Sequence, residues 1–404
     1  ISAIGLTPVT ECGIIWGTSS DITLENASYQ SVDLNSDEFS YTITGLEKAT
    51  RYYVRAYAKN ESGIGYSEVK YFITDWEGDA FDLSKGGTAN CYIVTPYYAE
   101  YKFNASVKGN STEPVGEIAS VEVLWETPMN YNSINVGDII DNVEIDGNEV
   151  HFTLPREPIP GNALVAVKDV NGSVLWSWHI WIVDYDPESK KVTLNNGAVI
   201  MDRNLGAISA APGANEAIGF MYQWGRKDPF PYPEYNFTIV PSDRVYYDYY
   251  DPSVSIESTI PTPHTVYDGA EWNYDSTLWG VNKTKYDPCP RGWKVSERGI
   301  WNGMHRADNY NSDYFELDPT CSDTYVSFPV AGRSEGTDYL YGSTCDGHMW
   351  TSTRGNYARI YIYDSYIYVY DNPVDHGYGI RCMKDADTSS DGSDDFTQSD
   401  DYEW

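Results

Sequence analysis

The chain has little positive charge and no long hydrophobic run. Its 404 residues contain 27 Lys and Arg against 60 Asp and Glu, a net charge of −33. Such an acidic chain repels phosphate backbones and anionic headgroups, so nucleic acids are not expected partners. The most apolar stretch, residues 174–183, is about half a bilayer-spanning length, so no membrane insertion is expected. No basic and apolar leader follows Ile1, which indicates a processed or truncated chain.

Recognisable catalytic and metal-binding motifs are also lacking. The six histidines are scattered, and no HExxH, GxSxG, phosphate-loop or dinucleotide fingerprint occurs. The six cysteines form no CxxC pair and are too sparse for a disulfide scaffold, which favours one or two bridges in an oxidising compartment. Two carboxylates could serve a glycosidase, but 60 acids give that signal no specificity. We therefore expect no enzyme activity, no metal site and no cofactor.

Short alternating segments closed by Gly, Asn, Asp and Pro recur along the chain, whereas helical periodicity is scarce. This pattern predicts a mostly β protein, and the length indicates two or three domains. The 36 tyrosines fit either extensive β-sheet or an aromatic recognition surface.

The first segment, residues 1–76, keeps a two-residue alternation through Tyr52, Val54, Ala56 and Ala58, with Leu46 before it. It resembles the latter half of a fibronectin type III domain, with Tyr52 in place of the corner tyrosine. That β-sandwich needs seven strands in roughly 90 to 100 residues, so one or two leading strands are expected to be missing. Either the sequence begins late, or another chain supplies a strand to the incomplete sheet.

The second segment, residues 81–186, contains a strong hairpin signal at Asn171-Gly172, which suits a type I′ turn. Pairing across that turn sets Val167 opposite Trp176 and Val165 opposite Trp178. Tryptophans in such a ladder usually belong to a core. The segment resembles the β-sandwich spacers of bacterial surface proteins.

The third segment, residues 190–385, contains six motifs in order: MDRNLGA (201–207), YQWGRKDPF (222–230), YDPCPRGWKV (286–295), SFPVAGR (327–333), HMWTST (348–353) and YGIRCMK (378–384). Together they resemble the FISUMP family of bacterial surface domains, related to the C-type lectin-like fold. The resemblance implies an α+β domain at the C-terminal end, after two β-sandwich modules. Ser296 departs from the family, which usually has proline there.

The same resemblance implies that Cys289 and Cys382 are structural, and they are expected to form a disulfide. Cys321 and Cys345 are a candidate second pair, whereas Cys12 and Cys91 are expected to be small buried residues. The EPN, QPD and WND tripeptides of calcium-dependent lectins are missing from the sequence. Sugar binding through a bridging metal is therefore not expected.

The acidic tail, residues 386–404, is expected to be flexible, because its carboxylates repel one another and it has few apolar residues. A calcium loop is an alternative, although its oxygen ligands are not at EF-hand spacing. A second alternative is docking on a neighbouring molecule through Phe396, Tyr402 and Trp404.

Residues 358–377 alternate aliphatic and tyrosine side chains. A hairpin turning at Asp364-Ser365 would set Tyr363 opposite Tyr366 and Tyr361 opposite Tyr368, with the aliphatic side chains on the other face. Tyrosines with short polar neighbours are typical of an antibody-like binding surface. Alternatively, the rings pack beneath a loop.

Residues 351–382 contain no Met, Trp, Lys, Glu or Gln, the five types that codons ending in cytosine cannot encode. With its place before the RC motif, this bias resembles the variable proteins of diversity-generating retroelements, in which adenine positions are rewritten. The resemblance implies these variable, ligand-binding residues: Tyr357, Tyr361, Tyr363, Asp364, Tyr366, Tyr368, Tyr370, Asp371, Asn372, Asp375 and His376.

The sequence thus predicts an extracellular binding protein of a bacterial surface, an adhesin or pilus tip, on a pilus or anchored to the outer membrane. Its expected ligand is a protein or glycan on another cell or host surface. The alternative is a structural pilus or fibre subunit, assembled by strand donation between neighbouring subunits and without a dedicated ligand site.

Overall fold

The structure is a computed structural model. It describes residues 7–34, 39–47, 50–74, 80–95, 100–128, 134–155, 157–230, 244–251, 254–270, 277–307, 314–317, 326–329, 333–334, 340–341, 346–361, 366–371 and 374–386. The chain divides into a first unit (residues 1–81, 97–100 and 154–158) and a second unit (82–96, 101–153 and 159–404).

The protein is nearly all β, with strands grouped into several separate sheets. The described residues contain no α-helix, only three 3-10 helices: η1 (Asn215–Ala217), η2 (Glu257–Thr259) and η3 (Arg298–Ile300). The expectation of an α+β C-terminal end is therefore wrong for the described residues. Helices are expected there from the family resemblance and not from a helical periodicity in the sequence. A helix of three residues forms too few hydrogen bonds to offset the free-energy cost of nucleating it.

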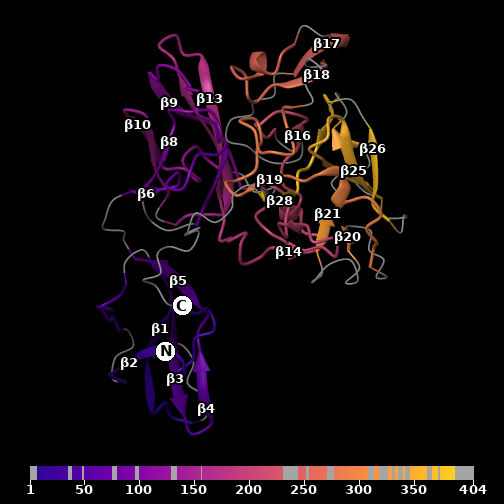
Figure 1. The fold of residues 1–404 in the computed structure, drawn as a ribbon. Helices are drawn as coiled ribbons and strands as arrows, with labels where there is room; N and C mark the ends of the chain where they lie inside the picture. The colour runs from indigo at the N-terminus through magenta and orange to yellow at the C-terminus, as the bar shows by residue number, and fades with distance from the viewer. Residues whose placement is uncertain are drawn as a thin grey trace. The chain divides into compact units, whose positions relative to one another are not determined.

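The first unit contains one five-stranded antiparallel sheet in the order β2 (Ser28–Val32), β1 (Glu11–Gly17), β3 (Arg51–Asn60), β4 (Gly63–Tyr66), with β5 (Lys70–Ile73) also paired to β3 (Figure 1). Tyr52 is buried at the start of β3, and its hydroxyl accepts a hydrogen bond from the Glu47 N–H at 3.1 Å. This is the contact that a corner tyrosine makes.

The small core of this unit lies on one face of the sheet, where Ile15, Ile22 and Tyr57 are buried. Val54 and Ala56 lie on the opposite face of the sheet. Ala56 pairs with Ile14, whereas the buried Ile15 pairs with Arg55, so Ala56 and Ile15 point to different faces. There Val54 is half-buried and Ala56 is exposed. Cys12 and Tyr52 share this face and are buried, so the described part of the face is exposed only around Ala56.

The second unit begins with two four-stranded sheets. One has the order β10 (Asn142–Asp146), β11 (Glu149–Thr153), β8 (Glu100–Asn104), β6 (Phe81–Asp82), and the other β7 (Cys91–Val94), β13 (Val174–Ile182), β12 (Gly161–Lys168), β9 (Ser120–Thr127). Aromatic rings pack between the two sheets, where the ring centres of Phe103 and Trp178 lie 5.1 Å apart. Figure 1 shows these strands in purple and magenta.

The predicted hairpin register is confirmed, because Val165 lies opposite Trp178 and Val167 opposite Trp176. Both indoles are fully buried, as expected for a core. The turn is longer than the predicted two residues: Gly172 (φ 81°) donates to the Asp169 carbonyl, and a bulge follows Val167. The bulge absorbs the extra residue and restores the register.

The other face of the β7–β13–β12–β9 sheet packs on the C-terminal segment. Ser177 donates to Asp228 at 2.6 Å, and the His179 ring lies 5.4 Å from Phe220. Asn162 donates to the Gly206 carbonyl at 3.0 Å. Residues 81–186 therefore share a buried interface with residues 190–385.

A buried lysine links the two sides of this interface. The Lys227 ammonium donates to Ser177 Oγ at 2.6 Å and to Asp228 at 2.5 Å, and lies 4.5 Å from the Trp176 ring centre. Both charged side chains are buried. Burial lowers the pKa of Lys227 to about 8. This group is one of several polar contacts between the sandwich and the C-terminal segment, together with those that Asn90, Asn110 and Glu113 make to residues 283–287.

The C-terminal segment consists of small sheets (Figure 1). Two sheets have four strands each, in the orders β14 (Val192–Thr193), β15 (Val199–Ile200), β28 (Cys382–Lys384), β19 (Trp293–Val295) and β16 (Tyr222–Gln223), β27 (Gly377–Tyr378), β22 (Arg333–Ser334), β23 (Leu340–Tyr341). A third sheet has three strands, β24 (Asp346–Trp350), β25 (Asn356–Tyr361) and β26 (Tyr368–Asp371). Two strand pairs complete the segment: β20 (Tyr314–Glu316) with β21 (Ser327–Pro329), and β17 (Arg244–Asp251) with β18 (Val266–Ala270).

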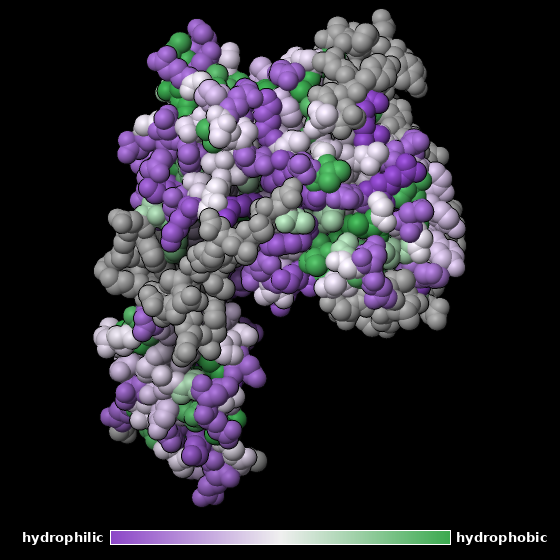
Figure 2. Space-filling view, in the orientation of Figure 1, coloured by the Kyte–Doolittle hydropathy of each residue, from purple (hydrophilic) through white to green (hydrophobic). Residues whose placement is uncertain are grey.

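Cys289 and Cys382, the pair that the family resemblance implies, form a disulfide that ties β28 to the loop before β19. Cys12 and Cys91 are free and buried, as expected. The predicted pair Cys321 and Cys345 lies outside the described residues. No helix among the described residues is long and apolar enough to cross a membrane. Hydrophilic side chains cover much of the surface seen in Figure 2.

Candidate functional site

The candidate site is the outer face of the antiparallel sheet β24–β25–β26. Its inner face packs on a hydrophobic core that contains Met349, Ile367 and Val369, together with Trp301 and Phe328. Ile367 is fully buried, and its N–H donates to the Met304 carbonyl at 2.9 Å. Packing of Ile367 in the core and this backbone hydrogen bond hold residues 366–370 in one orientation.

The predicted alternation holds at residues 366–370. Tyr366, Tyr368 and Tyr370 are 38%, 41% and 42% exposed, whereas Ile367 is buried and Val369 packs on the core. Successive side chains of a strand point to opposite faces, so burial of the aliphatic residues presents the phenols to solvent. The interpretation as a strand whose rings lie beneath a loop does not fit these three tyrosines.

The three tyrosines belong to a continuous series of rings. Ring centres lie 6.3 Å apart for Tyr366 and Tyr368, 6.3 Å for Tyr368 and Tyr370, and 6.0 Å for Tyr370 and Tyr357. At the other end, the His305 ring lies 4.3 Å from Tyr366. These five residues are called the aromatic row below. It runs from exposed His305 to buried Tyr357, where His348 and Tyr378 pack against it.

The predicted hairpin register is wrong by two residues. Arg359, not Tyr361, lies opposite Tyr368, and Tyr357 lies opposite Tyr370. Asp-Ser is a weak pair for a two-residue turn. Instead, Tyr366 pairs with His305 in an isolated bridge, which draws the start of this strand toward residues 304–305. A shift of two residues preserves the face of every side chain, so the tyrosines still point outward.

The other predicted residues fall into three groups. Asp371 is exposed, and the Asn356 amide donates to its carboxylate. Tyr357 and Asp375 are buried, and His376 is half-buried with its ring nitrogen 3.2 Å from the Tyr378 hydroxyl. The structure does not describe the Tyr361 side chain or the residues Tyr363, Asp364 and Asn372.

Two residues of this face, His305 and Arg359, are not predicted from the sequence. His305 is 61 positions before Tyr366, and nothing local to either residue indicates their contact. Arg359 shares the tyrosine face through its pairing with Tyr368, and its place in the alternation of residues 358–363 was a usable signal. The face therefore combines phenols with an imidazole, His305, and a guanidinium, Arg359.

The chemistry of this face is that of exposed phenols beside an imidazole and a guanidinium. Phenols offer large, rigid contact area together with a hydroxyl that both donates and accepts hydrogen bonds. The described part of the chain contains no group of three or more His, Cys, Asp or Glu placed to hold a metal ion.

Comparisons with known proteins add no identity. No family model and no curated protein matches the chain. A solved structure described as "cadmium bound structure of SporoSAG" is similar over 33% of this chain at 6% identity and a TM-score of 0.14. The chain spans 59% of that structure's length, and a similarity this weak carries no argument.

Proposed function

We propose that this chain is a non-enzymatic binding protein whose aromatic row contacts a protein or glycan ligand. The supporting observation is the set of three exposed tyrosines that alternate with Ile367, which is in the core, and Val369, which packs against it. Tyrosine is enriched where proteins recognise varied partners, because it buries much area at low conformational cost.

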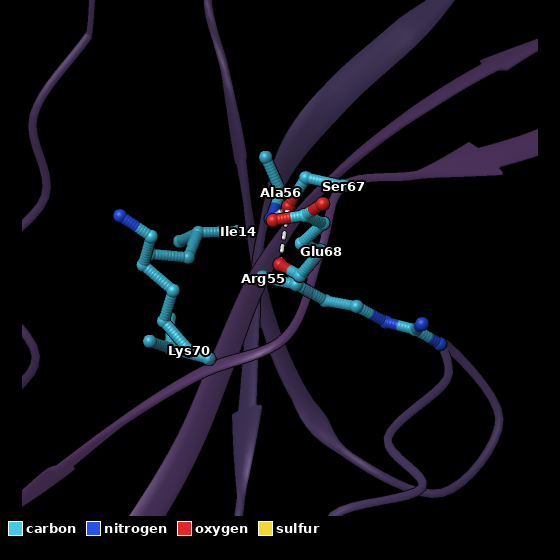
Figure 3. Close-up of a pocket in the computed structure, with 7 residues that line it drawn as sticks. Ile14, Arg55, Ala56, Ser67, Glu68 and Lys70 are labelled. Carbon is cyan, nitrogen blue, oxygen red and sulfur yellow. Dashed lines mark hydrogen bonds between the residues drawn. The ribbon is translucent and has the colours of Figure 1, made fainter. Parts of the chain in front are cut away.

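The proposed setting is extracellular, on a bacterial surface, with the chain as an adhesin or pilus tip. Its support is the resemblance of residues 190–385 to FISUMP domains and the modular order of the sequence. The alternative, a structural fibre subunit assembled by strand donation, draws its support from the partly exposed sheet face of the first unit around Val54 and Ala56 (Figure 3).

Replacing Tyr366, Tyr368 and Tyr370 together with Ser is expected to weaken adhesion at least tenfold, because aromatic anchors dominate binding energy. The free energy of unfolding should change by about 1 kcal/mol or less, since exposed side chains contribute little to folding. The measurement is the adhesion of protein-coated beads to cultured animal cells and to a printed glycan panel, beside urea unfolding.

The matched control replaces Tyr29 and Tyr71, which are 56% and 54% exposed in the first unit, with Ser. This variant should adhere like the wild type. Equal adhesion of the triple variant and the wild type would contradict the proposed site.

We also propose that the exposed tyrosines of the row are diversified by a retroelement, which would rewrite exposed positions and keep core ones. Tyr366, Tyr368 and Tyr370 tolerate such change because they are exposed, whereas Ile367 is buried and must stay apolar. Sequencing the gene and its downstream flank should reveal a near-identical repeat that differs only at template adenines. A flank without such a repeat would leave a fixed tyrosine-rich strand.

A further inference from the structure

The outer face of the β24–β25–β26 sheet carries a guanidinium on its middle strand. Arg359 of β25 lies opposite the exposed Tyr368 of β26 on one side and the buried His348 of β24 on the other. Side chains of residues that pair across strands share one face of a sheet, so Arg359 lies between these two rings. Its side chain is half-buried. The guanidinium is therefore partly shielded from the water that competes with a ligand.

The neighbours of this guanidinium on the same face are phenols. Tyr357 lies two positions before Arg359 on the same strand and pairs with Tyr370 of β26. Tyrosine and arginine are among the side chains that contribute most to binding energy at protein interfaces. The planar guanidinium matches a carboxylate, with which it forms two parallel hydrogen bonds. This face therefore favours a ligand that brings a carboxylate to Arg359.

Contacts inside the protein leave this possibility intact. Arg359 already interacts within the protein, but a guanidinium has five N–H donors and can contact more than one partner. The same strand pair also contains a carboxylate, that of Asp371, which lies opposite Asn356, about 10 Å along the strand from Arg359. The Asn356 amide donates a hydrogen bond to Asp371, which directs that carboxylate to Asn356.

The orientation of the exposed rings favours a protein ligand over a glycan chain. The planes of Tyr366 and Tyr368 are tilted by 57°, and those of Tyr368 and Tyr370 by 54°. Linked sugar rings would have to follow both tilts to stack on successive phenols, whereas protein side chains rotate one by one. The net charge of −33 repels a strongly acidic partner, so the carboxylate belongs on a neutral or basic surface.

We propose that Arg359 determines the specificity of this face, and that its ligand is a protein surface with an Asp or Glu carboxylate among side chains that pack on the tyrosines. This inference rests on the proposed function, because it takes the outer face of the sheet to be the binding surface. It adds the class of ligand and the residue that selects it.

The experiment selects a phage-displayed library of random peptides on the immobilised full-length chain and measures enriched peptides by fluorescence anisotropy. Enriched peptides are expected to contain Asp or Glu more often than the library does. Arg359→Gln should weaken their binding at least tenfold, because the peptide carboxylate loses its charged hydrogen bonds. Replacing that acid of the peptide with its amide should weaken binding to the wild type equally, and should add little to Arg359→Gln.

Two further variants control for folding and for general charge. Arg359→Lys keeps the charge but loses the planar fork, and should bind the peptides more weakly than the wild type with unchanged urea unfolding. Arg298→Gln removes an exposed arginine of η3, whose Ile300 belongs to the core beneath the sheet. This variant should bind like the wild type.

The outcomes distinguish this inference from the function on which it rests. Peptides that are lost when Tyr366, Tyr368 and Tyr370 become Ser, but that bind Arg359→Gln equally, overturn the inference and leave the proposed face. Enriched peptides without a surplus of acids, or binding confined to glycans of the printed panel, do the same. A chain that retains neither peptides nor glycans through the tyrosines overturns both.

Discussion

Lys227→Met is expected to lower the free energy of unfolding of the second unit by about 3 to 5 kcal/mol, because it leaves the buried Asp228 carboxylate without its charged partner. The variant also removes the ammonium donor of Ser177. Urea unfolding followed by tryptophan fluorescence measures this change, since nine of the tryptophans that the structure describes in the second unit are fully buried.

Two further variants separate charge from packing. Lys227→Met combined with Asp228→Asn should recover most of the loss, because no uncompensated charge remains and Ser177 keeps an acceptor. Lys168→Met is the control, since Lys168 forms a more exposed ion pair with Glu122 at 2.6 Å, and should cost about 1 kcal/mol or less. Equal losses for Lys168→Met and Lys227→Met would contradict a special role for the buried pair.

Loss of the Cys289–Cys382 disulfide is expected to cost about 4 to 5 kcal/mol, because the bridge closes a long loop in the unfolded chain. The two cysteines are 93 positions apart. Replacing both with Ser should therefore lower the melting temperature by roughly 10 °C. Thermal unfolding of the full chain measures the shift.

Reductant provides the internal control. Dithiothreitol should destabilise the wild type about as much as the double Ser substitution does, and should add little to that variant. Cys321→Ser with Cys345→Ser tests whether the second predicted pair shares the effect. If reductant leaves the wild-type melting temperature unchanged, the bridge contributes nothing to stability.

The sequence predicts structure well where the determinants are local. The ladder of Val165 and Val167 against Trp178 and Trp176 follows from alternation across one turn, and a bulge near Gly172 did not disturb it. Asp364-Ser365 carries no comparable turn chemistry, so the partner of Tyr368 was predicted wrongly although its face was right.

Contacts between segments that are distant in the sequence could not be predicted from local patterns. Ser177 and His179 interrupt an apolar run, and their meaning depends on Asp228 and Phe220 across the interface. A buried polar group needs a partner, so these interruptions indicate a second buried face once the strand is known to be covered. His305 likewise joins the aromatic row only through tertiary structure.

The sheet that is buried on both faces also limits how this gene can recombine. A crossover near residue 188 would separate Asn162, Ser177 and His179 from the groups they contact, and leave polar atoms buried without partners. Residues 82–385 therefore have to be inherited together. With the proposed function, new binding specificities are more readily acquired by substitutions along the exposed tyrosines than by exchange of whole domains.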